Sequence, residues 1–96
     1  MTNREVFKFI LYVAGDAHNS VEAIANLTAL CRLHLAGQHD IEIVDVFQQP
    51  ARALKDGIFL TPTLVKIAPL PVRQIIGTLG RTETVLQALG LTGALA

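Results

Sequence analysis

The sequence contains little cysteine and few aromatic residues, and it has no tryptophan. Cys31 is the single cysteine among 96 residues, which excludes an intramolecular disulfide and a Cys-x-x-Cys redox pair. Cys31 and His34 are spaced like two metal ligands on a helix, but no second ligand pair accompanies them, and His18 and His39 stand alone. We therefore expect no metal and no cofactor. With 51% hydrophobic and 5% aromatic residues, the expected core is aliphatic.

The sequence also lacks an excess of charge of either sign. Eight Lys and Arg residues balance eight Asp and Glu residues, and no basic stripe is present, so we expect no nucleic-acid partner. No run reaches the ~18 apolar residues of a membrane span, and residues 1–5 do not form an apolar signal region, so we expect a soluble cytoplasmic protein without membrane contact. The length predicts one domain, residues 1–96, and the low net charge permits a homo-oligomer.

The first half of the chain has the pattern of a βαβ unit. Residues 6–13 are apolar at all but one position, which predicts a strand that is buried on both faces. Asn19 and Glu22 have the spacing of a capping box and predict the start of a helix, which Gly37 would end. Residues 41–46 then predict a second strand, parallel to the first.

Prolines and glycines divide the second half of the chain. Pro50 can begin a short exposed helix that ends at Gly57. Pro62 has no amide hydrogen and disfavours helix at the residue before it, so it belongs at the start of a strand over residues 63–68. A Pro-Leu-Pro connection then leads to residues 72–77, which predicts an antiparallel hairpin.

The last predicted element is a helix that Thr82 can cap, with Val85, Leu86 and Leu89 on its apolar face and Gly90 at its end. The complete order is βαβ-α-ββα. This order resembles that of thioredoxin-like α/β domains, with a four-stranded mixed sheet and helices on both faces.

Three features of the sequence are candidate sites of chemistry. Ser20 is the only candidate nucleophile where a thioredoxin-superfamily thiol or glutathione enzyme carries its reactive residue, and nothing nearby would activate it. Cys31 lies about three turns further along the apolar stripe of the helix, which indicates a buried cysteine. Residues 77–81 contain two glycines and an arginine that could hold a phosphate, but a strand-to-helix turn explains them. Such an enzyme is therefore the alternative to a binding protein.

Several motifs occur together in one order. They are Leu11-Tyr12-Val13-Ala14-Gly15 with Asn19-Ser20, Ile43-Val44-Asp45-Val46 with Pro50, Thr61-Pro62-Thr63-Leu64 with Lys66, and Pro71-Val72-Arg73 with Ile75-Ile76-Gly77. In this order and spacing, which covers about residues 7–89, the chain resembles KaiB. KaiB is a small non-enzymatic component of the cyanobacterial circadian clock, and it also occurs in other bacteria beside a KaiC-like ATPase.

The resemblance implies a regulator of biological rhythms that binds the hexameric RecA-type ATPase KaiC in a phosphorylation-dependent way. The residues that it suggests for contact with a KaiC-like partner are Lys55, Asp56, Lys66 and Arg73. A KaiB-like sensory domain of a histidine kinase is a further alternative, and such a kinase could compete for the same partner. The family's lysines at the positions of Ile10 and Glu42 are associated with KaiA capture, and their replacement argues against KaiA binding.

The resemblance also implies a fold switch between a thioredoxin-like form and a ground-state fold with a rearranged C-terminal half. Ala88 and Gly90 stand where cyanobacterial relatives carry a glycine and an aspartate. Alanine favours helix over glycine by roughly 0.5 to 1 kcal/mol, and Gly90 supplies a C-terminal cap. We therefore predict a thioredoxin-like resting state in which the Thr61–Pro62 peptide bond is cis.

Overall fold

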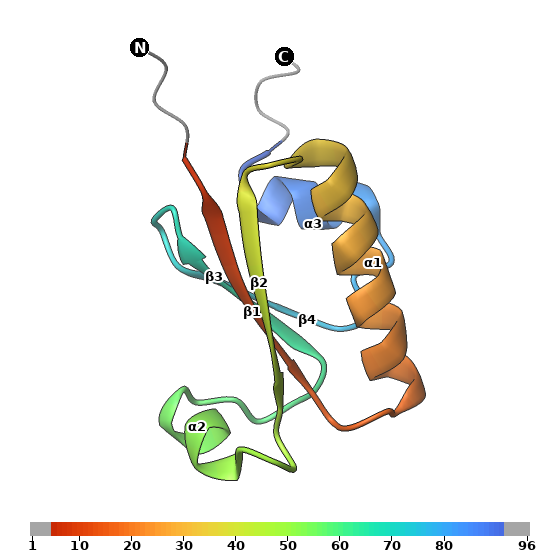
Figure 1. Ribbon diagram of the computed structural model, residues 1–96, viewed down its shortest axis with the longest axis vertical. Coiled ribbons are helices and arrows are strands. Elements are labelled where there is room, and N and C mark those ends of the chain that lie inside the picture. Colours follow the sequence, from red (N-terminus) through yellow and green to blue (C-terminus); the bar gives the residue numbers. More distant parts are fainter. Residues whose placement is uncertain (1–4, 92–96) are drawn as a thin grey trace.

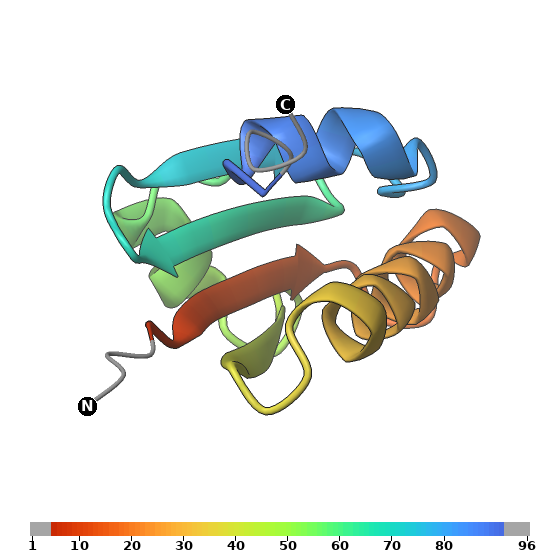
Figure 2. The ribbon, with the colours of Figure 1, turned by 90° about the horizontal axis from the view of Figure 1, so that it is seen from above.

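Residues 5–91 are described by a computed structural model, in which one mixed sheet lies between helices (Figures 1 and 2). The elements in chain order are β1 (Phe7–Val13), α1 (His18–His34), β2 (His39–Asp45), α2 (Pro50–Lys55), β3 (Thr63–Ala68), β4 (Arg73–Ile76) and α3 (Thr82–Ala88). The strand order is β2-β1-β3-β4, in which β2 is parallel to β1 and the pairs β1–β3 and β3–β4 are antiparallel. This is the predicted βαβ-α-ββα arrangement rather than its alternative with a rearranged C-terminal half.

Strand β1 lies inside the sheet, and its side chains enter two separate cores. Phe9 and Leu11 belong to the core under α1 and α3, whereas Ile10 and Tyr12 belong to the core under α2. All four are at least 92% buried, because strand side chains alternate between faces and both faces of β1 are covered. The uninterrupted apolar run in the sequence is a consequence of this position.

Helix α1 begins two residues earlier than the capping-box pattern predicts. Its N-cap is Ala17, which carries no capping side chain, and Asn19 is already the second residue of the helix. The predicted Asn19 cap is therefore wrong, since a cap must precede the first helical residue. A side chain from the first turn instead returns to the loop before the helix, where the Oγ of Ser20 accepts a hydrogen bond from the Ala14 amide at 3.0 Å.

Within residues 5–91, no helix has the length and hydropathy needed to cross a membrane.

Helix α3 confirms the predicted C-terminal helix, with a different start. Thr82 is its first helical residue rather than its cap, and no side chain caps the helix there. At the other end, Gly90 has φ +77° and its amide donates to the Gln87 carbonyl at 3.0 Å. The Leu91 amide donates to the Leu86 carbonyl at 2.8 Å. These two hydrogen bonds form a Schellman motif, in which a left-handed glycine ends the helix as predicted.

The cis Thr61–Pro62 bond that we predicted is present. Two further cis bonds, Ala68–Pro69 and Leu70–Pro71, lie in the connection between β3 and β4 and were not predicted. The connection makes an antiparallel hairpin in which Lys66 lies opposite Arg73, which confirms the predicted pairing of these two strands.

Candidate functional site

Helix α2 lies at one end of the molecule (Figure 1), and the chain carries exposed apolar residues on this helix and directly before and after it. Phe47 precedes the helix and is 73% exposed, Leu54 lies on it and is 71% exposed, and Phe59 follows it and is 85% exposed. Leu60, the next residue, is 59% exposed. Single exposed apolar residues are ordinary, but a group of them is typical of a surface that contacts another protein. We call this group together with Lys55 the α2 surface.

Local sequence determines which side of α2 points outward. Pro50 is the first helical residue, and Gly57 ends the helix with φ +71°. The amide of Gly57 donates to Leu54 at 3.1 Å, and the amide of Ile58 donates to Ala53 at 2.9 Å, which makes a second Schellman motif. Ala53 and Ile58 are buried against the sheet, so Leu54, one position further along the helix than Ala53, faces outward.

The carboxylate of Asp56 is engaged within the chain. Asp56 is the C-cap of α2, and its Oδ2 accepts a hydrogen bond from the hydroxyl of Tyr12 on β1. Tyr12 is 1% exposed, and its burial, together with the hydrogen bond to Asp56, raises the pKa of the phenol to about 12. The phenol is therefore neutral near pH 7 and remains a hydrogen-bond donor to the carboxylate.

A second polar contact joins α2 to β2. The Nη1 and Nη2 atoms of Arg52 donate to Oε2 and Oε1 of Glu42 at 2.6 and 2.7 Å. These hydrogen bonds lower the pKa of Glu42 and raise that of Arg52, because each group stabilises the charge on the other. Among the charged residues of α2 and its C-cap, Lys55 has no ion-pair partner within residues 5–91. Lys55 is thus the charge on this surface that is available to another molecule.

The structure places Lys66 and Arg73 away from the α2 surface. Lys66 shares the face of β3 that carries Leu64, under α1 and α3, and only 4% of it is exposed. Its Nζ lies 5.8 Å from the ring centroid of Phe7. Lys66, which the resemblance suggests as a contact residue, is thus buried, since strand alternation places it on the helix-covered face. Arg73 is exposed on the neighbouring strand, so the four suggested contact residues do not form one surface.

The residues weighed as catalytic are poorly placed for chemistry. Ser20 is 1% exposed and already bonded to the backbone of Ala14. Cys31 has no exposed surface, and its burial raises the pKa of the thiol to about 11, which disfavours the reactive thiolate. The loop at residues 77–81 is a strand-to-helix turn, in which Leu79 is buried with φ +64°.

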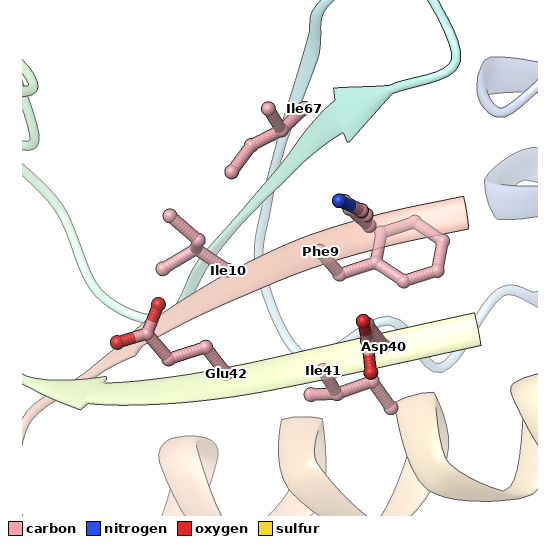
Figure 3. Close-up of a pocket in the computed structure, with 7 residues that line it drawn as sticks. Phe9, Ile10, Asp40, Ile41, Glu42 and Ile67 are labelled. Carbon is pink, nitrogen blue, oxygen red and sulfur yellow. The ribbon is translucent and has the colours of Figure 1, made fainter. Parts of the chain in front are cut away.

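An open depression lies on the sheet face that α2 only partly covers. It is formed by side chains from β1, β2 and β3, with Ile10 and Ile67 as its apolar part and Lys8, Asp40 and Glu42 as its charged part (Figure 3). Within residues 5–91, no three His, Cys, Asp or Glu side chains gather closely enough to hold a metal ion. Apolar and charged side chains are mixed in the depression, as they are on ordinary protein surface.

Sequence reasoning found Lys55 and Asp56 but missed the other residues of this region. Tyr12 offered a signal, because a tyrosine in a buried strand needs a partner for its hydroxyl. Phe47 and Phe59 offered none, because isolated apolar residues in connecting segments carry no periodicity that shows which way they point.

The fold and the single cysteine define a thioredoxin-like domain without the cysteine pair of a dithiol enzyme. Solved structures with low sequence identity share this fold. The N-terminal domain of SasA from Synechococcus elongatus superposes with a TM-score of 0.75 at 17% identity, over 95% of this chain and 87% of that domain. Mitochondrial thioredoxin 3 from Saccharomyces cerevisiae superposes with a TM-score of 0.71 at 19% identity, over 91% of this chain and 80% of that one.

Sequence comparison then identifies the family. The KaiB domain matches residues 10–91. The circadian clock protein KaiB3 of Synechocystis is 43% identical over 89 residues, which are 93% of this chain and 85% of that protein. The circadian clock oscillator protein KaiB of Synechococcus elongatus is 42% identical over 91 residues, 95% of this chain and 89% of that protein. The chain belongs to the KaiB family.

Proposed function

We propose that this chain is a non-enzymatic clock regulator that binds a KaiC-like hexameric RecA-type ATPase through the α2 surface and modulates its phosphorylation cycle. Membership in the KaiB family supports the regulatory role, since the relatives are named circadian clock proteins. The observation that carries the docking proposal is the group of exposed apolar residues on and beside α2, together with Lys55, which has no ion-pair partner in the part of the chain that the structure describes.

The exposed side chains of the α2 surface are suited to anchoring a partner. Complete burial of one Phe or Leu side chain contributes roughly 1.5 to 3 kcal/mol, and a few such anchors dominate the affinity of most interfaces. Lys55 would mainly influence the association rate and the choice of an acidic counterpart. Arg73 and the buried Lys66 would contact only a partner that also reaches the β3–β4 ribbon.

The inaccessible positions of Ser20 and Cys31 favour binding over thiol or glutathione chemistry. A thiol enzyme needs an accessible thiolate, whereas the Cys31 thiol is buried and has a raised pKa. Neither Ser20 nor Cys31 is therefore suited to act as the nucleophile of such an enzyme.

Binding to the KaiC-like hexamer of the source organism tests the proposal. We expect Phe59→Ser and Leu54→Ser to weaken the affinity by about 10- to 100-fold, since each removes an anchor of roughly 1.4 to 3 kcal/mol. The matched control is Leu33→Ser on α1, because Leu33 is 77% exposed and lies outside the α2 surface. Isothermal titration calorimetry measures the affinity, and far-ultraviolet circular dichroism confirms that each variant is folded.

Two results would contradict the proposal. Equal losses for Phe59→Ser and Leu33→Ser would show that the α2 surface is not the docking site. Binding to a histidine kinase but not to the KaiC-like hexamer would show that the partner was wrongly assigned.

A further inference from the structure

We infer that Tyr12, Glu42, Arg52 and Asp56 are positioning residues that hold α2 in place and thereby set the geometry of the α2 surface. The two contacts that carry this inference are the hydrogen bond from Tyr12 to Asp56 and the double hydrogen bond from Arg52 to Glu42. We call these four residues the α2 clasp. Its effect on partner binding rests on the proposed function, whereas its effect on α2 itself does not.

Helix α2 depends on contacts outside itself. It has six residues, and isolated helices of fewer than about 12 residues are marginal in water. Ala53 is its one buried residue, and a methyl group contributes little apolar burial. Ile58 anchors the chain just beyond the helix. The polar contacts of the clasp therefore contribute a large part of what orients α2.

The clasp joins the short helix to two neighbouring strands. Arg52, the third helical residue, pairs with Glu42 on β2, and Asp56, the C-cap, pairs with Tyr12 on β1. Because β1 and β2 are paired in parallel, the two contacts attach the helix to one rigid surface at two points. Two separated attachments fix the rotation of a helix, which one attachment leaves free. The burial of Ala53 and Ile58 turns Leu54 outward, and the clasp would hold the helix in that orientation.

The two contacts differ in how strongly they should act. The Arg52–Glu42 pair is about one-third to one-half exposed, and exposed ion pairs contribute little individually. Loss of the Asp56 carboxylate would deprive the buried Tyr12 hydroxyl of its acceptor, and an unsatisfied buried group is costly. We therefore expect the Tyr12–Asp56 contact to dominate and the Arg52–Glu42 pair to refine the orientation.

Charge reversal and its rescue test the inference. We expect Glu42→Arg to speed hydrogen exchange of the α2 amides by about three- to tenfold, because it places two cations together in place of an ion pair. Adding Arg52→Glu restores the pair with the charges exchanged, so exchange and affinity for the KaiC-like hexamer should both recover. Glu22→Arg is the matched control, since Glu22 forms an exposed contact with His18 on α1.

The second contact has its own spectroscopic signal. Tyr12 is the single tyrosine, and the chain has no tryptophan, so tyrosinate absorbance reports this residue alone. In Asp56→Asn, loss of the carboxylate charge should lower the titration midpoint of Tyr12 from about 12 toward its ordinary value. The positive charge of Arg52, which remains in this variant, also lowers the pKa of Tyr12. Because a neutral amide oxygen is a weaker acceptor than a carboxylate, Asp56→Asn should also speed exchange of the α2 amides.

The inference is overturned if the double variant fails to recover slow exchange, or if Asp56→Asn leaves both the Tyr12 midpoint and the exchange of α2 unchanged. Recovery of slow exchange without recovery of affinity would show that Arg52 or Glu42 contacts the partner directly and is not merely positioning. Because exchange and absorbance need no partner, a failure of the proposed function leaves the test of the clasp intact.

Discussion

At the scale of single residues, the hydroxyl of Tyr12 shows how a polar atom in an apolar strand can organise a site. Its acceptor, the carboxylate of Asp56, lies 44 residues further along the chain, at the end of α2. A buried hydroxyl is costly without a partner, so this contact both satisfies Tyr12 and locates the C-cap of the helix. Asp56 was predicted to face a partner protein. It is exposed, and one of its carboxylate oxygens accepts from Tyr12, so the residue can also hold α2 in place.

Two buried residues, Tyr12 and Cys31, predict how the stability of the fold depends on alkaline pH. Burial and Asp56 raise the pKa of Tyr12 from 10.0 to about 12, and burial raises that of Cys31 from 9.0 to about 11. Folding therefore favours the protonated form of each group. The associated stability is complete below the ordinary pKa and is lost as pH rises through the folded value, by roughly 2 to 3 kcal/mol for each group.

Urea unfolding at a series of pH values measures this loss. We expect the unfolding free energy to decrease from about pH 9 to about pH 12, first through Cys31 and then through Tyr12. Cys31→Ala should remove the earlier part of the decrease and leave the later part in place. A decrease that begins at the same pH with and without the thiol would contradict the assignment to Cys31.

At the scale of elements, the short helices depend on how they end. Both α2 and α3 finish in a left-handed glycine with a Schellman pair of hydrogen bonds, at Gly57 and Gly90. A Cβ at Gly90 would meet no atom within 4 Å, so the reason for glycine there is the backbone conformation and not a lack of space. Other residues pay roughly 1 kcal/mol or more to adopt that conformation.

Gly90→Ala should therefore lower the unfolding free energy by about 1 kcal/mol, measured by urea denaturation at neutral pH. The control is Gly80→Ala in the loop before α3, where φ lies outside the left-handed region. A Cβ there would lie 3.5 Å from Oγ1 of Thr78, which is ordinary contact, so little change is expected. Equal losses in the two variants would show that the left-handed backbone is not what makes Gly90 necessary.

At the scale of the whole molecule, the chain adopts the thioredoxin-like arrangement, with strands β3 and β4 and helix α3 in its second half. We predicted that Ala88 and Gly90 favour this arrangement, since alanine supports helix α3 and the glycine ends it. Ala88→Gly with Gly90→Asp should therefore raise the population of the ground-state fold that the resemblance implies by about tenfold, for a combined effect near 1.4 kcal/mol.

Nuclear magnetic resonance detects that population as a second, slowly exchanging set of amide resonances. The chemical shifts of residues 63–68 should differ between the two sets, because these residues form β3 in the resting arrangement. A destabilised double variant with a single set of resonances would show that these two residues affect the stability of α3 without deciding between folds.

The sequence by itself determined the order of the elements and many of their ends. An apolar run is sufficient to indicate a central strand, and the fixed backbone of proline and the left-handed freedom of glycine mark the beginning of α2 and the ends of α2 and α3. These are local properties, so a short window of residues contains them. The caps proposed at Asn19 and Thr82 were wrong because helix starts without a side-chain cap leave a less specific local pattern.

Only the tertiary structure decided which residues form the site. Lys66 is buried because strand alternation and the packing of α1 and α3 place it on a covered face, which its charge did not indicate. Asp56 meets Tyr12, and Arg52 meets Glu42, across segments whose approach depends on the whole sheet. Such pairs require the free energy of many distant contacts to bring them together, and no single stretch of sequence contains that information.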